Sequence, residues 1–142
     1  MNLLTDFDDC LKKGLIQKTA PSKEQALLSL GKAKEALEDA KANFSEKRYD
    51  AATIIAYMSL LNAAKAILFR DGYREKSHIC IVRYLEAKHA EIGLDKIALF
   101  DSFRETRHEV QYSAAFRASA KQAEAIVNFA ADFIKNAEEI VG

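Results

Sequence analysis

The chain has 142 residues, of which 21 are basic and 21 acidic, so its formal net charge is zero. Hydrophobic residues make up 49% and charged residues 30%, a mixture that excludes a disordered or fibrous chain. The length fits one domain that buries about two-thirds of its unfolded surface, and the neutral balance argues against a generally basic nucleic-acid binder or a polybasic membrane anchor. Five Gly and one Pro indicate long, continuous elements with few turns.

Residues 1–21 predict a short helix followed by a loop. The helix spans about Thr5 to Lys13 and ends at Gly14, and Pro21 marks the loop. The N-terminus is acidic and lacks the apolar run of a signal peptide, which favours a cytoplasmic protein.

The two cysteines, Cys10 and Cys80, are far apart in the sequence and show neither metal-type nor Cys-x-x-Cys spacing. We therefore expect each to act as a small apolar residue in a reducing, intracellular setting.

A long helix begins at Ser22, because Gln25 three residues later completes a capping box. Apolar residues then recur at alternating spacings of four and three, which predicts one buried stripe. The stripe consists of Ala26, Leu30, Ala33, Leu37, Ala40 and Phe44. Residues 45–49 form the turn that follows.

The next helix, about Asp50 to Asp71, is apolar on nearly every side, and Gly72 ends it. Residues 51–69 contain 15 apolar residues in 19, with Lys65 among the polar exceptions. A lysine inside a membrane span costs roughly 2.5–3.5 kcal/mol on insertion scales. This segment is therefore interpreted as the buried central helix of a bundle, with no membrane involved.

Three further helices complete the chain. The fourth begins at Ser77 and ends before Gly93, the fifth covers about Asp95 to Gln111, and a capping box at Ser119 opens the last. No segment alternates with the period of a strand. The sequence predicts an all-α, mainly antiparallel bundle of about five to six helices, in a single domain over 1–142 with the bundle itself at 22–142.

Metal and nucleophile chemistry find little support. Residues 86–89 and 105–108 are two Glu-x-x-His pairs, but a di-metal bundle also needs inward carboxylates on two other helices, and the central helix has none between residues 51 and 69. We interpret them as solvated glutamates and surface or edge histidines, including His89 and His108. No Gly-rich phosphate loop or nucleophile motif occurs, so we expect no metal and no cofactor.

Five residues form a cationic and aromatic set that fits an anionic ligand such as phosphate. In this interpretation Lys65 contacts the anion instead of only extending its charge to solvent. Ser77 likewise marks a helix N-terminus that binds the anion, instead of serving only as a cap. Residues 65–88 carry a net charge of +3, which residues 122–142 cancel with −3, so the overall neutrality hides a local basic region. The candidate ligand-binding residues are Lys65, Lys76, His78, Arg107 and Tyr112.

Several segments together resemble the HEPN domain (higher eukaryotes and prokaryotes nucleotide-binding). They are residues 49–52, 56–57, 62–69, 71–78 and 130–133, together with Arg107 and Tyr112. The resemblance covers roughly Ser22 to Gly142. It implies an α-helical bundle that forms a homodimer and pairs with a minimal nucleotidyltransferase in a toxin–antitoxin or defence system.

Some members of this family are metal-independent ribonucleases with an Arg, four to six residues, then a His. Here Tyr112 stands where that His would follow Arg107, and His108 lies only four positions beyond Arg104. Tyr is a poor general base near pH 7 because its pKa is about 10. We therefore expect a domain without robust catalysis that binds nucleotide or RNA phosphate or docks a nucleotidyltransferase.

Two alternatives stay open. One is a ribonuclease toxin that uses Arg104 or Arg107 with His108. The other is a structural dimeric bundle without a ligand.

Overall fold

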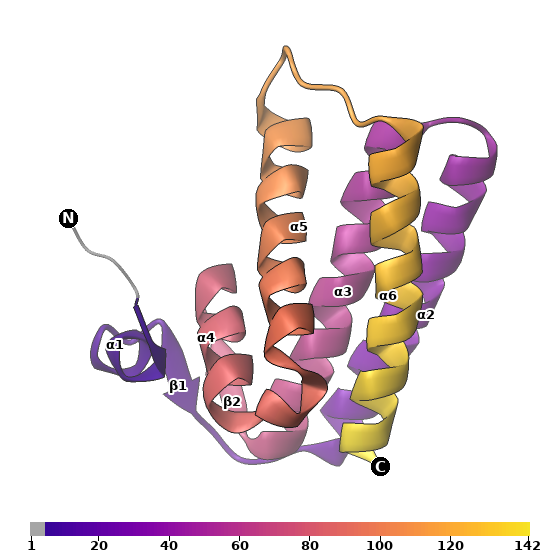
Figure 1. The fold of residues 1–142 in the computed structure, drawn as a ribbon. Coiled ribbons are helices and arrows are strands. Elements are labelled where there is room, and N and C mark those ends of the chain that lie inside the picture. Colours follow the sequence, from indigo (N-terminus) through magenta and orange to yellow (C-terminus); the bar gives the residue numbers. More distant parts are fainter. Residues whose placement is uncertain (1–4) are drawn as a thin grey trace.

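The computed structural model describes residues 5–142, in which six α-helices dominate, so the prediction of an all-α bundle is confirmed (Figure 1). The elements in chain order are α1 (Phe7–Lys12), β1 (Ile16–Lys18), α2 (Lys23–Ser45), α3 (Tyr49–Asp71), β2 (Tyr73–Glu75), α4 (His78–Lys88), the 3-10 helix η1 (Ala90–Ile92), α5 (Leu94–Tyr112) and α6 (Ala120–Val141).

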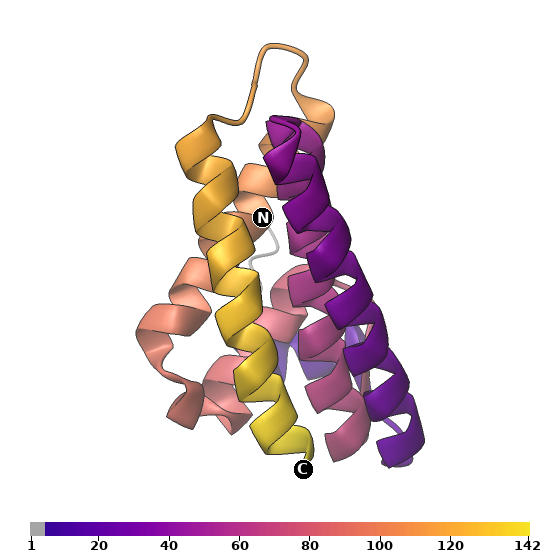
Figure 2. The same cartoon turned by 90° about the vertical axis from the view of Figure 1, so that its right-hand side faces the viewer.

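The long helices α2, α3, α5 and α6 run side by side, and α3 contacts the other three (Figures 1 and 2). The shorter α4 lies beside α5, with α1 and the strands on its outer side (Figure 1). By length and composition alone α3 passes as a membrane span, yet 61% of its most apolar window is buried within the protein, as in the core helix of a bundle.

The helix starts follow the capping chemistry of the sequence. The Ser22 hydroxyl accepts a hydrogen bond from the backbone N–H of Gln25 at 3.1 Å, and Ser119 and Gln122 form a complete capping box. The predicted stripe on α2 is buried from Ala26 to Ala40, and Phe44 at its end is half-buried.

Two short strands depart from the sequence prediction, which has none. β1 and β2 pair antiparallel, with Ile16 opposite Glu75 and Lys18 opposite Tyr73. Three residues are too few to display the alternation that signals a strand. The pairing also joins distant parts of the chain, which no local pattern reports. β2 lies just before α4 in the chain, so its pairing with β1 constrains how that helix begins.

Cys10 and Cys80 form a disulfide that joins α1 to α4, with 5.8 Å between the two Cα atoms. Both residues are fully buried. The expectation that each cysteine acts alone is therefore wrong, because α1 packs against α4 and brings together positions that the sequence separates widely. The cytoplasmic location loses the support of free cysteines and stays a prediction.

A polar network around His89 ties the end of α3 to the end of α4. One ring nitrogen, Nε2, contacts the Asp71 carboxylate and the other, Nδ1, lies 3.0 Å from Glu91, while the Tyr84 hydroxyl donates to Asp71. His89 is 6% exposed, so its interpretation as a surface or edge residue is wrong. Burial alone would raise the pKa of Asp71, but hydrogen bonds from Tyr84, His89 and Arg70 outweigh it and lower this pKa.

Reduction of the disulfide should lower the free energy of unfolding by about 2–4 kcal/mol, because the bond restricts the unfolded chain over a long loop. Urea unfolding with and without a dithiol reductant measures the difference. The variant Cys10→Ala/Cys80→Ala is the control and should respond equally in both conditions. Two free thiols in the purified, unfolded wild-type chain would contradict the prediction.

Asp71 should make the protein sensitive to acid. Because its folded-state pKa is lowered, its contribution to stability is complete above the unfolded-state value of about 3.9 and is lost as the pH falls through the folded-state value. Asp71→Asn should therefore destabilise the protein near neutral pH and do so less at about pH 3, below the unfolded-state pKa. Urea unfolding of both proteins at the two pH values tests this, and an equal loss at both would exclude it.

Candidate functional site

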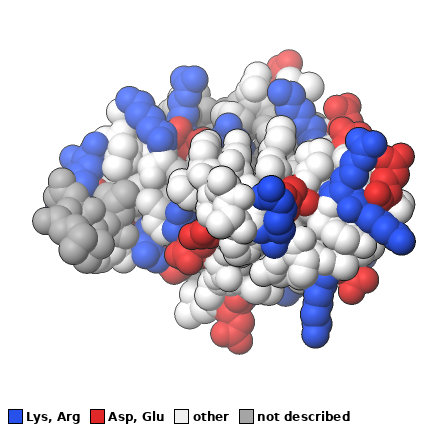
Figure 3. Space-filling model, turned by 90° about the horizontal axis from the view of Figure 1, so that it is seen from above, with Lys and Arg blue, Asp and Glu red and all other residues white. Residues whose placement is uncertain are grey.

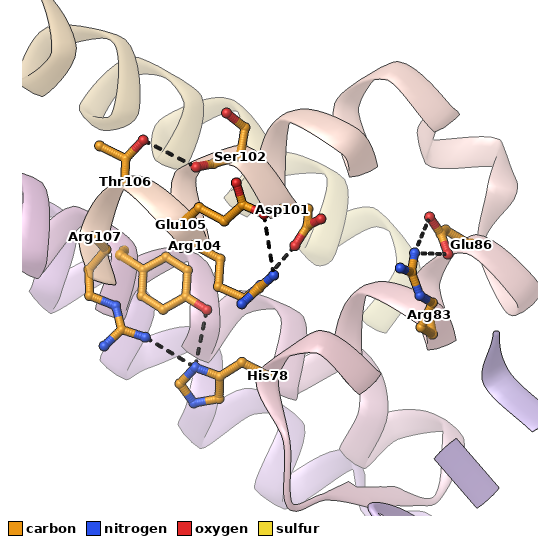
Figure 4. Close-up of polar contacts among 10 residues, drawn as sticks. His78, Arg83, Glu86, Asp101, Ser102, Arg104, Glu105, Thr106 and Arg107 are labelled. Atoms are coloured by element: carbon orange, nitrogen blue, oxygen red, sulfur yellow. Dashed lines mark hydrogen bonds and ion pairs between the residues drawn. The ribbon is translucent and has the colours of Figure 1, made fainter. Parts of the chain in front are cut away.

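Arg107 of α5 and His78 at the start of α4 point toward one another (Figure 4), and Tyr57 of α3 contacts both. The Arg107 Nη2 and the Tyr57 hydroxyl oxygen lie 3.3 Å and 3.2 Å from the same atom, His78 Nδ1. The guanidinium carbon of Arg107 is 4.6 Å from the centre of the Tyr57 ring, within range of a cation–π contact. Three helices thus converge on one imidazole.

Local structure holds each of these side chains in place. Tyr57 lies on the buried side of α3 and is 1% exposed. His78 is the first residue of α4, and the extended backbone of Ser77 precedes it without a capping hydrogen bond from the Ser77 side chain. Arg107 Nη1 donates to the Gln111 side-chain oxygen at 3.0 Å, one helical turn further on. The Arg107 guanidinium is therefore oriented by Gln111 at Nη1 and by His78 at Nη2.

These residues border a pocket of about 200 Å³. Its lining, in which no carboxylate occurs, consists of Ile54, Tyr57, Met58, Leu61, His78, Arg107 and Gln111. Among residues 5–142 no acidic side chain forms an ion pair with Arg107, and the buried Nε of Arg107 has no hydrogen-bond partner. Arg104, one turn earlier, is neutralised by Asp101 at 2.8 Å (Figure 4).

Burial and neighbouring positive charges shift the pKa values of the His78 and Tyr57 side chains. Burial lowers the pKa of His78, and the charges of Arg107, Lys65 and Arg104 lower it further. Burial likewise raises the pKa of Tyr57. Because a guanidinium only donates hydrogen bonds, His78 Nδ1 must accept, and the ring is neutral with its proton on Nε2.

The five sequence-predicted ligand residues are not all brought together. His78 and Arg107 share the pocket, whereas Lys65 lines two adjacent hollows between α2 and α3 and influences His78 only through its charge. Lys76 is exposed on the approach to α4. Tyr112 is 65% exposed and does not line the pocket.

The alternative catalytic set is also divided. His108 is exposed, and its ring lies 4.7 Å from that of Tyr112. Arg104 pairs with Asp101, so the histidine in contact with an arginine of α5 is His78. Sequence reasoning did not assign Tyr57 or Gln111 to the site. Tyr57 has the apolar context of a core residue, whereas Gln111 carries a usable signal, its spacing of four from Arg107.

The charge distribution is mixed at one end of the bundle. Figure 3 views the end of the bundle that carries the 113–119 loop, and basic and acidic side chains are interspersed there. At this end Arg117 lies 4.0 Å from Asp50, and Arg48 lies 3.4 Å from Glu46.

Replacement of Arg107 should raise the pKa of His78 toward its ordinary value, because a neighbouring positive charge is removed. NMR titration of the His78 ring in wild-type protein and in Arg107→Gln measures the shift. Arg104→Gln is the matched control, with a smaller expected effect because Asp101 offsets the charge of Arg104. An unchanged His78 titration in Arg107→Gln would contradict the arrangement described here.

Comparison with known proteins gives one informative result. No curated protein matches this chain. A family model described as the HEPN domain matches residues 26–140, a range that contains α3, α4, α5 and nearly all of α2 and α6. The match covers most of the sequence and includes all three residues that meet in the pocket. The chain belongs to the HEPN domain family.

Proposed function

We propose that this protein binds the phosphate of a nucleotide or RNA at the pocket of Arg107, His78 and Tyr57. The observation that carries the proposal is Arg107 itself, a partly buried guanidinium with no acidic partner among residues 5–142. Membership of the HEPN family supports a nucleotide- or RNA-related function in general.

A phosphate suits this pocket because it supplies the missing negative charge and several acceptor oxygens at once. Arg107 holds the anion with two donors, as guanidinium groups do with planar pairs of oxygens. Lys65 and Lys76 extend the positive charge from the pocket toward α2 and the start of α4, along which further phosphates of an RNA would run. Tyr112, exposed on the next face of α5, offers a stacking surface for a base.

The resemblance also implies a partner protein. Pairing with a minimal nucleotidyltransferase, in a toxin–antitoxin or defence system of the cytoplasm, follows from the family likeness alone and is part of the same proposal. The surface hollows between α2 and α3 do not overlap the Arg107 side chain, so a partner and a phosphate would not compete for it.

A metal-independent ribonuclease is the second candidate, and one observation favours it. The lowered pKa of His78 keeps its imidazole neutral near pH 7, beside the guanidinium of Arg107. When the substrate displaces the contacts of Arg107 and Tyr57 with His78 Nδ1, that nitrogen can accept the proton of a ribose 2′-hydroxyl, while the released Arg107 guanidinium stabilises the charge that develops on the phosphate. His78 thereby takes the role that the sequence alone offers to His108.

Arg107→Gln should weaken binding of a short single-stranded RNA by about 10- to 100-fold, since a charged hydrogen bond contributes about 1.5–3 kcal/mol. Fluorescence anisotropy at fixed salt measures the affinity. Arg104→Gln, which removes the same charge one turn away, should have a clearly smaller effect. An equal loss of RNA affinity in both variants would show that binding depends only on the overall positive charge, and it would overturn the proposal.

Incubation of the same single-stranded RNA with the protein decides between binding and cleavage. Intact RNA after prolonged incubation with wild-type protein supports binding alone. Cleavage that His78→Gln abolishes and His108→Gln leaves unchanged would establish the ribonuclease.

A further inference from the structure

The disulfide between Cys10 and Cys80 lies close in the chain to the candidate site. Cys80 is the third residue of α4, whose first residue is His78, and Cys10 belongs to α1, on the outer side of α4 (Figure 1). The HEPN family model matches residues 26–140, so Cys80 lies inside the matched range and Cys10 lies before it. The bond therefore joins the start of α4 to a segment that the family model does not include.

Backbone hydrogen bonds connect α1 to the same place by a second route. The N–H of Leu15 donates to the carbonyl of Cys10 at 3.0 Å, and the carbonyl of Leu15 accepts from the N–H of Lys76 at 2.8 Å. His78 is thus held two positions before it, through Lys76, and two positions after it, through Cys80. The side chain just before His78 makes no capping hydrogen bond, so the start of α4 depends on these two attachments.

The disulfide is a large part of what holds α1 in place. This helix has six residues, of which Phe7 and Cys10 are buried. Isolated helices shorter than about 12–15 residues are marginal in water, so α1 depends on its contacts with the rest of the protein. The Phe7 ring packs edge-on against Tyr73 and Tyr84, with 5.8 Å and 5.4 Å between ring centres. Breaking the disulfide leaves this aromatic contact as the main attachment of α1.

We propose that the Cys10–Cys80 bond is a redox control of the Arg107 pocket. In the oxidised protein His78 is fixed with Nδ1 facing the Arg107 guanidinium, and the pocket is preorganised for an anion. In the reduced protein α1 separates from α4, the start of α4 loosens, and His78 no longer orients Arg107. The proposal rests on the phosphate site proposed above and names its regulation.

The reductant is a dithiol, either a small molecule or a protein. One of its thiols loses a proton and attacks the Cys10 sulfur, which forms a mixed disulfide and releases Cys80 as a thiolate that takes up a proton. The second thiol then loses its proton and attacks the mixed disulfide, which releases Cys10 in the same way. Two electrons and two protons pass to the cysteines, and the dithiol becomes a disulfide.

Access to the bond depends on local opening of the N-terminal segment. Both cysteines are fully buried, so a reductant reaches the sulfur atoms when α1 moves away from α4. Such a movement needs less free energy than unfolding of the bundle, because α1 contributes only two buried residues. Disulfides in reducing compartments are usually transient or redox-sensing. The cytoplasmic location that the sequence predicts is therefore compatible with a bond that breaks and re-forms.

The first test compares RNA binding in the two oxidation states by fluorescence anisotropy. Reduction with a small dithiol should weaken binding of a short single-stranded RNA about three- to tenfold, because a side chain that must be ordered on binding lowers affinity by such a factor. Cys10→Ala and Cys10→Ala/Cys80→Ala should each bind as the reduced wild type does and should not respond to the dithiol. Leu11→Ala, at an exposed position of α1, is the matched control and should respond as the wild type does.

The second test examines the pocket in the absence of RNA. Reduction should raise the pKa of His78 toward its ordinary value in an NMR titration, because the ring leaves its buried position beside Arg107. Circular dichroism should show that the long helices persist. Equal RNA affinity in both oxidation states, or loss of the whole helical fold on reduction, would overturn the redox control.

The two tests separate this proposal from the proposed function. RNA binding that Arg107→Gln weakens and the dithiol leaves unchanged would refute only the redox control. A His78 titration that responds to the dithiol in a chain that binds no RNA would refute only the phosphate proposal.

Discussion

Burial of α3 is the constraint on which the rest of the structure depends. This helix is apolar on nearly every side, so α2, α5 and α6 pack around it. The cover is incomplete along one strip, where Ile54, Met58, Leu61 and Lys65 stay partly open at helical spacing. The pocket of Arg107 borders this strip on one side and the larger hollow between α2 and α3 on the other. The Arg107 pocket therefore lies along the sector of the central helix that the fold leaves uncovered.

Residues 5–21 help to form the site, although none of their side chains lines the pocket. His78 begins α4, and the residues just before it are fixed by β1, whose neighbour Leu15 accepts a hydrogen bond from the Lys76 N–H at 2.8 Å. Two residues beyond His78, Cys80 is bonded to α1. The imidazole is thus held between a strand pair and a disulfide, which gives α1 and β1 a function in placing the polar groups of the pocket.

Local patterns were sufficient for the helices and insufficient for the contacts between them. The Ser22 cap, the Ser119 capping box and the stripe on α2 are found where the sequence predicts helix starts and a buried face, because those features depend on neighbours in sequence; at Ser22 only the serine half of the predicted box forms. The disulfide, the three-residue strands and the burial of His89 depend on segments far apart in the chain. Residue spacing does not show which distant segments come into contact. The sequence therefore predicts two unpaired cysteines and an exposed His89, each as if it had no partner elsewhere in the chain.

The contrast between Arg104 and Arg107 shows that part of the site was accessible from helical spacing. Three residues before Arg104 stands Asp101, which neutralises it, whereas the positions three and four away from Arg107 hold Phe103, Arg104, Val110 and Gln111. An arginine without an acid one turn away has no neighbouring negative charge to offset its own. Partial burial makes such an unpaired charge costly. Such a residue is favourable mainly when an anion arrives from outside, which is why Arg107 and not Arg104 defines the candidate site.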